Sequence, residues 1–386
     1  MYIEHIIIGG GIAGCYIALQ CLEKGYSFIC FESKKQGEPW GKQITLKKDG
    51  TNIELGSSVI HSNQKNIVDM VQKLNLHAIP FEDEKNTKTW NKIPRSVSKP
   101  IKDKLKVFVQ NNIEKSKQMT VEEMALLCLK KEEINLLKES WFNWFESKDE
   151  IAYTYYTSTE REGTYLQIKE GFQSVLTESQ KRFPIYFNHT VIELIRDKDG
   201  YQVIVEVDKE IKKYKCKYCY YTIDFAHSSY IKLTNCPLLK SYLSLGISKA
   251  SSRVYVCFKN PVKFYDKVDN KKIINIVGGV GHWSFKITDK IWMLSYVDGS
   301  EVEKVKYLCE ENKCIKDWVS FIYDTFKVEG EIEIEEVIGA FWKHAFTLLK
   351  PAFFNKNIQP LEPNLICTTI PKPFNQAWSE GHLFNI

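Results

Sequence analysis

The sequence predicts an α/β protein of two domains, in which a Rossmann-like dinucleotide-binding domain is interleaved with a domain of mixed sheet and helices. The first observation is the apolar strand Ile6–Ile8, which runs directly into Gly9-Gly10-Gly11. A helical pattern follows this turn, and a second apolar strand, Phe28–Phe31, then ends on an acidic residue. The third observation is that strand-rich sequence returns near residue 163, after a helical region. We therefore expect the dinucleotide-binding domain to be built from separate segments.

Each glycine of the turn has its own expected role. Gly9 permits the bend, Gly11 lets backbone N–H groups approach a pyrophosphate, and Gly14 lets the helix pack closely on the sheet. The helix N-terminus directs its partial positive charge at the phosphates. Glu32, at the tip of the second strand, is placed to accept hydrogen bonds from ribose hydroxyls. Since a carboxylate would repel a 2′-phosphate, the pattern favours FAD or NAD over NADP.

The remaining elements follow in chain order. After Trp40-Gly41-Lys42 we expect a hairpin and a returning strand over residues 43–61, and then a helix over residues 63–76. A helical pattern over residues 120–147 begins with a capping box at Thr120. Further strands are predicted within residues 163–223, at 252–260 and at 291–298, and residues 301–326 have helical spacing.

These elements predict five interleaved segments. The dinucleotide-binding domain is expected to comprise residues 1–80, 163–232 and 340–386. The second, substrate domain is expected to comprise residues 81–162, which are helical, and residues 233–339, which form a sheet. Within the helical part, an aromatic cluster has two interpretations, a patch facing a membrane or partner and a core helix, of which the core is favoured. The cluster consists of Trp141, Phe142, Trp144 and Phe145.

Composition excludes several classes of function. The net charge of +5 is modest for 386 residues, and no basic cluster alternates with aromatic residues, so nucleic acid is not an expected partner. Residues 5–22 are uncharged, but Glu4 precedes them and three glycines interrupt them, which argues against a signal peptide or a membrane span. Eleven cysteines without a secretory signal predict a reducing, cytoplasmic compartment. Lysine, isoleucine and asparagine are plentiful, which suggests an AT-rich coding genome.

One CxxC pair, Cys216 and Cys219, has Cys236 and His227 nearby. Positions three apart in a strand face opposite sides of a sheet, so a zinc site here would need a turn. We predict no metal site.

The ordered blocks of the chain resemble the flavin-containing amine oxidases, the family of monoamine and polyamine oxidases. The resemblance covers most of the chain. It is carried by Gly9, Gly11, Gly14, Gly25 and Glu32, by Trp40-Gly41-Lys42, by Glu54-Leu55-Gly56, by Val59-Ile60-His61, by Val191 and by Trp378-Ser379-Glu380-Gly381.

The resemblance implies an FAD-dependent oxidase that transfers a hydride equivalent from the α-carbon of an amine to flavin N5. The imine would then be hydrolysed, and oxygen would reoxidise the flavin to give hydrogen peroxide. Trp378 and Phe346 are the implied aromatic walls of the amine site, and His61 resembles the histidine of polyamine-oxidase versions of its block. The implied cofactor-binding residues beyond the fingerprint are Lys42, Val191, Trp342, Thr368, Thr369, Glu380 and Gly381.

The chain departs from the family in three places. Arg253 stands where the family has a lysine that is water-linked to flavin N5, although only five of the 53 basic residues are arginines. Its fork could stabilise the reduced flavin or bind a substrate carboxylate, or it could simply pair with an acid. Cys367-Thr368-Thr369 replaces a Gly-Glu pair that contacts the ribityl chain, and the sequence ends at Ile386, where the family's last helix would begin.

The covalent-attachment cysteine has no counterpart near Trp342, so FAD is expected to bind non-covalently. Two alternatives stay open. One is an FAD oxidoreductase or desaturase for a non-amine or acidic substrate, and the other is a catalytically inactive FAD-binding protein. A homo-oligomer is also open at this point.

Overall fold

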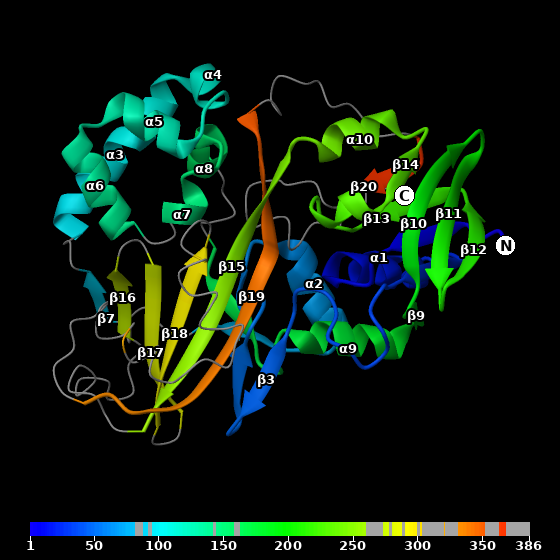
Figure 1. Cartoon of the computed structure of the whole chain (residues 1–386), viewed down its shortest axis with the longest axis horizontal. Helices are drawn as coiled ribbons and strands as arrows, with labels where there is room; N and C mark the ends of the chain where they lie inside the picture. The colour runs from blue at the N-terminus through cyan, green and yellow to red at the C-terminus, as the bar shows by residue number, and fades with distance from the viewer. Residues whose placement is uncertain are drawn as a thin grey trace.

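The computed structural model describes most of the chain. The described residues are 1–81, 88–91, 95–141, 144–157, 163–259, 273–277, 280–287, 290–298, 302, 320, 331–351 and 363–367. Within them the fold is the predicted α/β class, with a Rossmann-like domain joined to a region of mixed sheet and helices (Figure 1).

A parallel five-stranded sheet forms the centre of the Rossmann-like domain. Its strands, in spatial order, are β20 (Leu365–Cys367), β13 (Tyr218–Tyr221), β1 (His5–Ile8), β2 (Phe28–Phe31) and β9 (Ile185–Tyr186). These strands are short apolar runs because both faces of the sheet are covered. Three distant parts of the chain therefore meet in one sheet, as the interleaved arrangement predicts. The domain boundaries themselves remain predictions.

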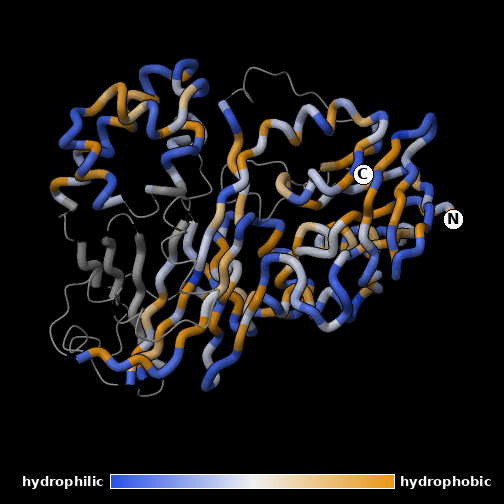
Figure 2. Tube along the Cα trace, viewed as in Figure 1, coloured by the Kyte–Doolittle hydropathy of each residue, from blue (hydrophilic) through white to orange (hydrophobic). Residues whose placement is uncertain are grey.

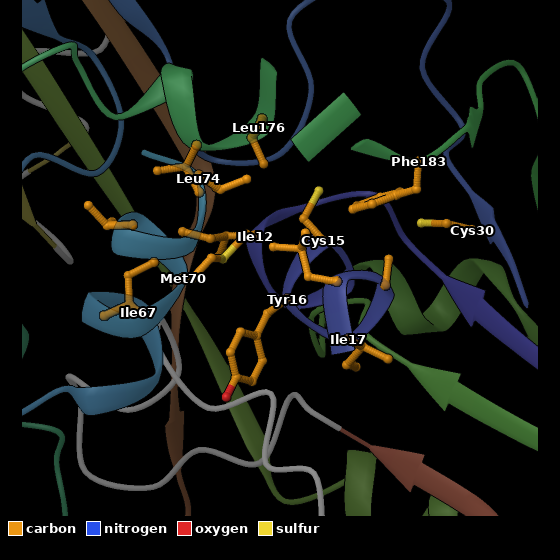
Figure 3. Close-up of a cluster of buried hydrophobic side chains, with 14 of the residues drawn as sticks. Ile12, Cys15, Tyr16, Ile17, Cys30, Ile67, Met70, Leu74, Leu176 and Phe183 are labelled. Atoms are coloured by element: carbon orange, nitrogen blue, oxygen red, sulfur yellow. The ribbon is translucent and has the colours of Figure 1, made fainter. Parts of the chain in front are cut away.

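Alternate residues of β1 point into two different cores. On one face, Ile7 belongs to a core that includes residues of helices α1 (Ile12–Glu23), α2 (Lys65–Lys73) and α9 (Gln173–Arg182). Figure 3 shows the side chains that these helices contribute to this core. On the other face, Ile6 and Ile8 pack against a second sheet and α10 (Pro237–Leu243). That sheet has the order β12 (Glu210–Cys216), β11 (Gly200–Val207), β10 (Thr190–Asp197) and β14 (Lys232–Thr234). The alternation with a period of two is the strand pattern that this layered fold requires.

A six-stranded sheet forms the second region. Its order is β19 (Ile334–Leu349), β15 (Gly246–Phe258), β18 (Lys290–Asp298), β17 (Val280–Ile287), β16 (Ile273–Val277) and β7 (Lys88–Asn91). The long strands β15 and β19 pair antiparallel and run between the two halves of the molecule (Figure 1). They are the elements that bring the second sheet to the dinucleotide-binding domain.

A helical lobe lies beside one end of this sheet (Figure 1). Hydrophobic and hydrophilic stretches alternate along its chain, as in amphipathic helices (Figure 2). Its helices are α3 (Arg95–Asn111), α4 (Ile113–Ser116), α5 (Val121–Cys128), α6 (Lys131–Ser140), α7 (Trp144–Ser147) and α8 (Ala152–Thr157). Trp141 and Trp144 are buried in the lobe's core, as the favoured interpretation predicts, whereas Phe142 lies outside the described residues.

Small sheets connect these parts. The hairpin of β3 (Thr45–Lys48) and β4 (Thr51–Glu54) is the one predicted, and β5 (Ile60–His61) pairs with β8 (Tyr165–Ile168), which also pairs with β6 (Ala78–Pro80). The helix predicted over 301–326 lies almost wholly outside the described residues. In the part of the chain that the structure describes, no helix combines the length and apolarity needed to cross a bilayer. No group of histidine, cysteine and acidic side chains suited to a metal occurs there either.

Candidate dinucleotide and substrate site

The turn after β1 has the geometry of a dinucleotide cradle. Gly9 has a φ of +107°, and its N–H donates to the Phe31 carbonyl over 2.9 Å. A Cβ on Gly14 would lie 1.9 Å from the Gly9 oxygen, so this position of α1 accepts only glycine. A Cβ on Gly11 would meet nothing closer than Gly41 Cα at 3.8 Å. The backbone is therefore open beside Gly11 and closed at Gly14, which fits a pyrophosphate at the N-terminus of α1.

Glu32 lies directly beside this turn. Its carboxylate is buried, and Oε2 accepts the Gly10 N–H at 3.0 Å while Oε1 accepts the Lys34 N–H at 3.0 Å. The Glu32 carbonyl accepts the His189 N–H, so Val191 at the start of β10 begins close to the same residue. These contacts fix an acid at the carboxyl end of β2, where a ribose would lie.

Lys42 lies on the opposite side of the turn from Glu32. Gly41 has a φ of +65°, and a Cβ built on it would lie 3.4 Å from Gly11 Cα. The Lys42 ammonium is 3.1 Å from Asp224 Oδ2 and donates to the Ala345 carbonyl over 2.9 Å. Asp224 follows β13 and Ala345 belongs to β19. One cation thus connects the cradle to both neighbouring segments.

His227 also holds Asp224. Both its backbone N–H and its Nδ1 lie 2.9 Å from Asp224 Oδ1. Burial alone would raise the pKa of Asp224, but the hydrogen bonds from His227 and the charge of Lys42 hold that pKa well below its usual range. The His344 ring packs edge-on against His227, and its Nδ1 lies 3.0 Å from Ser248 Oγ. Burial and the neighbouring His227 lower the pKa of His344.

The Glu54-Leu55-Gly56 segment joins the cradle to the six-stranded sheet. A Cβ on Gly56 would lie 2.0 Å from the Lys42 carbonyl, and the Ser57 N–H donates to the same oxygen. Donors from β15 and β19 hold the carbonyl groups of this segment. Tyr255 Oη donates to the Glu54 carbonyl over 3.0 Å, Arg253 Nη1 lies 3.4 Å from the same oxygen, and Trp342 Nε1 donates to the Leu55 carbonyl over 2.7 Å.

The Glu54 carboxyl group faces the other way, into the protein. It accepts the Thr45 hydroxyl at 2.7 Å and the Phe172 N–H at 3.0 Å. Burial raises the pKa of Glu54 to about 7, against the lowering effect of these hydrogen bonds and of Arg253. Glu54 is therefore a buried acid that titrates near neutral pH.

The other predicted site residues are placed as follows. His61 is buried against Tyr165, with the ring centroids 4.1 Å apart, and its Nδ1 lies 3.4 Å from the Gly163 carbonyl. Phe346 is buried on β19, opposite Lys249 of β15. Five predicted residues lie outside the described part of the chain, namely Thr368, Thr369, Trp378, Glu380 and Gly381.

The sheet order gives a direction to a bound dinucleotide. Glu32 follows β2, the glycine turn follows β1 and Asp224 follows β13, and these three strands are parallel neighbours. Ligands of such sheets bind outside the carboxyl ends of the strands. A dinucleotide with its ribose at Glu32 would pass over the glycine turn toward Lys42, and its far end would approach β15 and β19.

Sequence reasoning did not single out the contacts of Asp224, His227 and Tyr255, nor Tyr296, whose ring centroid lies 5.0 Å from Arg253 Cζ. Asp224 had an available signal, because it is an acid that closely follows a predicted parallel strand, and such positions often contact ligands. The sequence held no such signal for Tyr255 and Tyr296, because their contacts depend on how β15 and β18 pack against the rest of the fold.

Comparisons with known proteins agree with this geometry. Residues 7–74 match the NAD(P)-binding Rossmann-like domain family. No curated protein sequence matches the chain. The fold is similar to that of putrescine oxidase, both in the wild type bound to putrescine and in a double mutant redesigned in cofactor binding. For each the TM-score is 0.76 at 11% identity, over 98% of this chain and 96% of that chain. At 11% sequence identity, these matches show a similarity of fold and nothing further.

Proposed function

We propose that this protein is an FAD-dependent oxidase of amines. When bound, FAD would accept a hydride equivalent at N5 from the amine α-carbon, and oxygen would take up the electrons as hydrogen peroxide, with the imine hydrolysed in water. The observation that carries the proposal is the acid-flanked glycine cradle, set in a chain whose whole fold follows that of putrescine oxidase.

The described residues account for the binding of the dinucleotide. Gly9 and Gly11 let backbone N–H groups reach the pyrophosphate, and the N-terminus of α1 stabilises its charge. Glu32 would exchange its hydrogen bond from the Gly10 N–H for bonds from ribose hydroxyls. Lys42 would provide a positive charge beside the phosphates. Val191 would contact the adenine through its backbone.

The choice of a flavin over a nicotinamide rests on the second region. Arg253 of β15 and Trp342 of β19 contact the carbonyl groups of Glu54 and Leu55, which supports a cofactor whose far end extends toward these two strands. By the family resemblance, Trp342, Thr368, Thr369, Glu380 and Gly381 would hold the flavin non-covalently, with Phe346 and Trp378 beside the amine. The contacts of His61 suit a structural position, so a polyamine substrate has no support from that residue.

The first test is the absorption spectrum of the purified protein, with bands expected at about 375 and 450 nm for oxidised flavin. Glu32→Ala should weaken FAD retention, because each charge-assisted ribose hydrogen bond contributes about 1.5–3 kcal/mol. Glu210→Ala is the matched control, since Glu210 is exposed on the edge strand β12. A colourless protein that stays colourless after incubation with FAD contradicts the proposal.

The second test separates turnover from binding. Amines should bleach the flavin under anaerobic conditions and release peroxide in air. Flavin that no amine, amino acid or other acid reduces would instead indicate a binding protein without oxidase activity. Reduction by acids that lack an amine would indicate the second class of flavoenzyme.

A further inference from the structure

We propose that Arg253 binds a carboxylate of the substrate, so that the oxidised amine is an amino acid or another amine that also carries an acid. This inference rests on the oxidase function proposed above and narrows its substrate class.

The guanidinium of Arg253 is held in a defined orientation. Its Cζ lies 5.0 Å from the centroid of the Tyr296 ring, and the two residues are directly paired between β15 and β18. Stacking on an aromatic face is a preferred environment of arginine. The ring therefore supports one face of the guanidinium, and the N–H groups point outward within its plane.

The contact with the Glu54 carbonyl does not require an arginine. Tyr255 Oη already donates to this oxygen over 3.0 Å, whereas Arg253 Nη1 is 3.4 Å away. A guanidinium has five N–H donors in a planar fork that matches a carboxylate bidentately. Within the described residues, the guanidinium contacts the Glu54 carbonyl through Nη1 and also hydrogen-bonds the Tyr255 side chain. Neither of these partners is a carboxylate that would match the fork bidentately.

The charge of Glu54 interacts with Arg253, but the Glu54 carboxyl oxygens are hydrogen-bonded to other partners. Glu54 gives one carboxyl oxygen to the Thr45 hydroxyl and the other to the Phe172 N–H. Its carboxyl group therefore makes no bidentate pair with the guanidinium. Arg253 is half-buried, and a half-buried cation gains most from an anion that meets it in a partly desolvated place.

The position also suits a substrate. Arg253 contacts Glu54, and Gly56 of the same segment packs on the carbonyl of Lys42 beside the pyrophosphate turn. The guanidinium is thus on the Lys42 side of the cradle, away from Glu32, where the reactive end of the dinucleotide would lie. A carboxylate held there would orient the α-amine of the same molecule toward that end.

The presence of arginine rather than lysine at position 253 indicates that the planar guanidinium matters there, and not only its positive charge. Five of the chain's 53 basic residues are arginines, so a position that needed only a positive charge would be expected to carry lysine. Lysine offers a point charge and cannot make the bidentate contact.

The experiment compares matched ligand pairs that differ by one carboxylate: ornithine and putrescine, phenylalanine and phenethylamine, leucine and isopentylamine. Dissociation constants are measured from anaerobic flavin reduction with the FAD-loaded protein. The variants are Arg253→Gln, Arg253→Lys and, as control, Arg182→Gln at the exposed end of α9. Circular dichroism checks that each variant is folded.

We expect the acid of the best-bound pair to bind at least about tenfold more tightly than its amine, as a charge-assisted bidentate contact provides. Arg253→Gln should abolish that preference, so that the acid and its amine bind this variant equally. Arg253→Lys should retain part of the preference, and Arg182→Gln should retain all of it. Equal binding of acid and amine to the flavin-loaded protein, or a preference that survives Arg253→Gln, overturns this inference alone. Flavin that none of these ligands reduces counts against the proposed function and this inference together. A protein without flavin overturns the proposed function and this inference with it.

Discussion

The Lys42 ammonium lies 3.1 Å from Asp224 Oδ2 and joins the loop that follows β2 to the segment that follows β13. Its other partner, the Ala345 carbonyl, belongs to β19 of the second sheet. Because Gly41 packs against Gly11, this pair also lies beside the glycine turn that follows β1. The contact therefore joins three chain segments and holds a positive charge beside the glycine turn.

Replacing Lys42 by methionine should weaken FAD binding. The phosphates would lose a cation, and Asp224 would keep its negative charge beside them. We expect a loss of roughly tenfold in affinity, in line with one charge-assisted contact. Fluorescence titration of the apoprotein with FAD measures it, and the matched control is Lys47→Met on the exposed face of the hairpin. Equal FAD affinities for the two variants would mean that Lys42 does not contribute to cofactor binding.

Replacing Asp224 by asparagine should reduce stability in a manner that depends on pH. The pKa of Asp224 is held below its ordinary value of 3.8, so its charged form stabilises the fold above that value and the benefit is lost as the pH falls below it. At pH 7 the variant should be less stable by about 2 kcal/mol. Urea unfolding at pH 7 and in acid tests this, with Asp199→Asn in the exposed turn after β10 as control. A deficit that stays constant into acid would contradict it.

Local sequence determines the cradle, and for this reason it could be predicted. Gly9, Gly11, Gly14 and Glu32 lie within one strand–helix–strand unit, and their relative positions follow from the backbone geometry of that unit. Asp224 could not be assigned to Lys42 in this way, because the two are brought together only when β13 pairs beside β1.

One predicted element differs from the structure for an identifiable reason. The helix predicted over 120–147 is divided into α5, α6 and α7, because the chain is extended at Leu129 and Lys130 and again at Trp141. The Glu133 side chain accepts the Lys130 N–H at 3.0 Å and caps the new helix, a local signal that the apolar spacing concealed. The register that brings Trp342 to Leu55 depends on the pairing of β15 with β19, which no local pattern specifies.

Alanine at two neighbouring glycines should separate cofactor binding from folding. A Cβ at position 14 would lie 1.9 Å from the Gly9 oxygen, so Gly14→Ala should destabilise the protein by about 3 kcal/mol or more. A Cβ at position 11 meets only Gly41 Cα, at the ordinary contact distance of 3.8 Å. Gly11→Ala should therefore fold normally and lose FAD, because the methyl group would occupy the space beside the pyrophosphate. Thermal unfolding and FAD titration of both variants measure this. Normal FAD binding by Gly11→Ala would place the pyrophosphate elsewhere.

Glu54 should make the wild-type protein less stable as the pH rises through neutrality. Burial raises its pKa to about 7 from 4.5, so the folded state holds a proton that the unfolded state releases at lower pH. The stability contributed by the protonated form is complete below pH 4.5 and is lost as the pH approaches 7. The full difference amounts to about 3 kcal/mol.

Glu54→Gln keeps the carboxamide oxygen for the Phe172 N–H and has no proton to lose. The variant should therefore be more stable than the wild type at about pH 8, with the advantage shrinking toward pH 5. Urea unfolding at both pH values measures this, and Glu210→Gln on the exposed strand is the control. Parallel stability profiles for wild type and Glu54→Gln would mean that Glu54 ionises at its ordinary pKa. In that case its negative charge would lie near Arg253 at neutral pH and weaken the binding of a substrate carboxylate there.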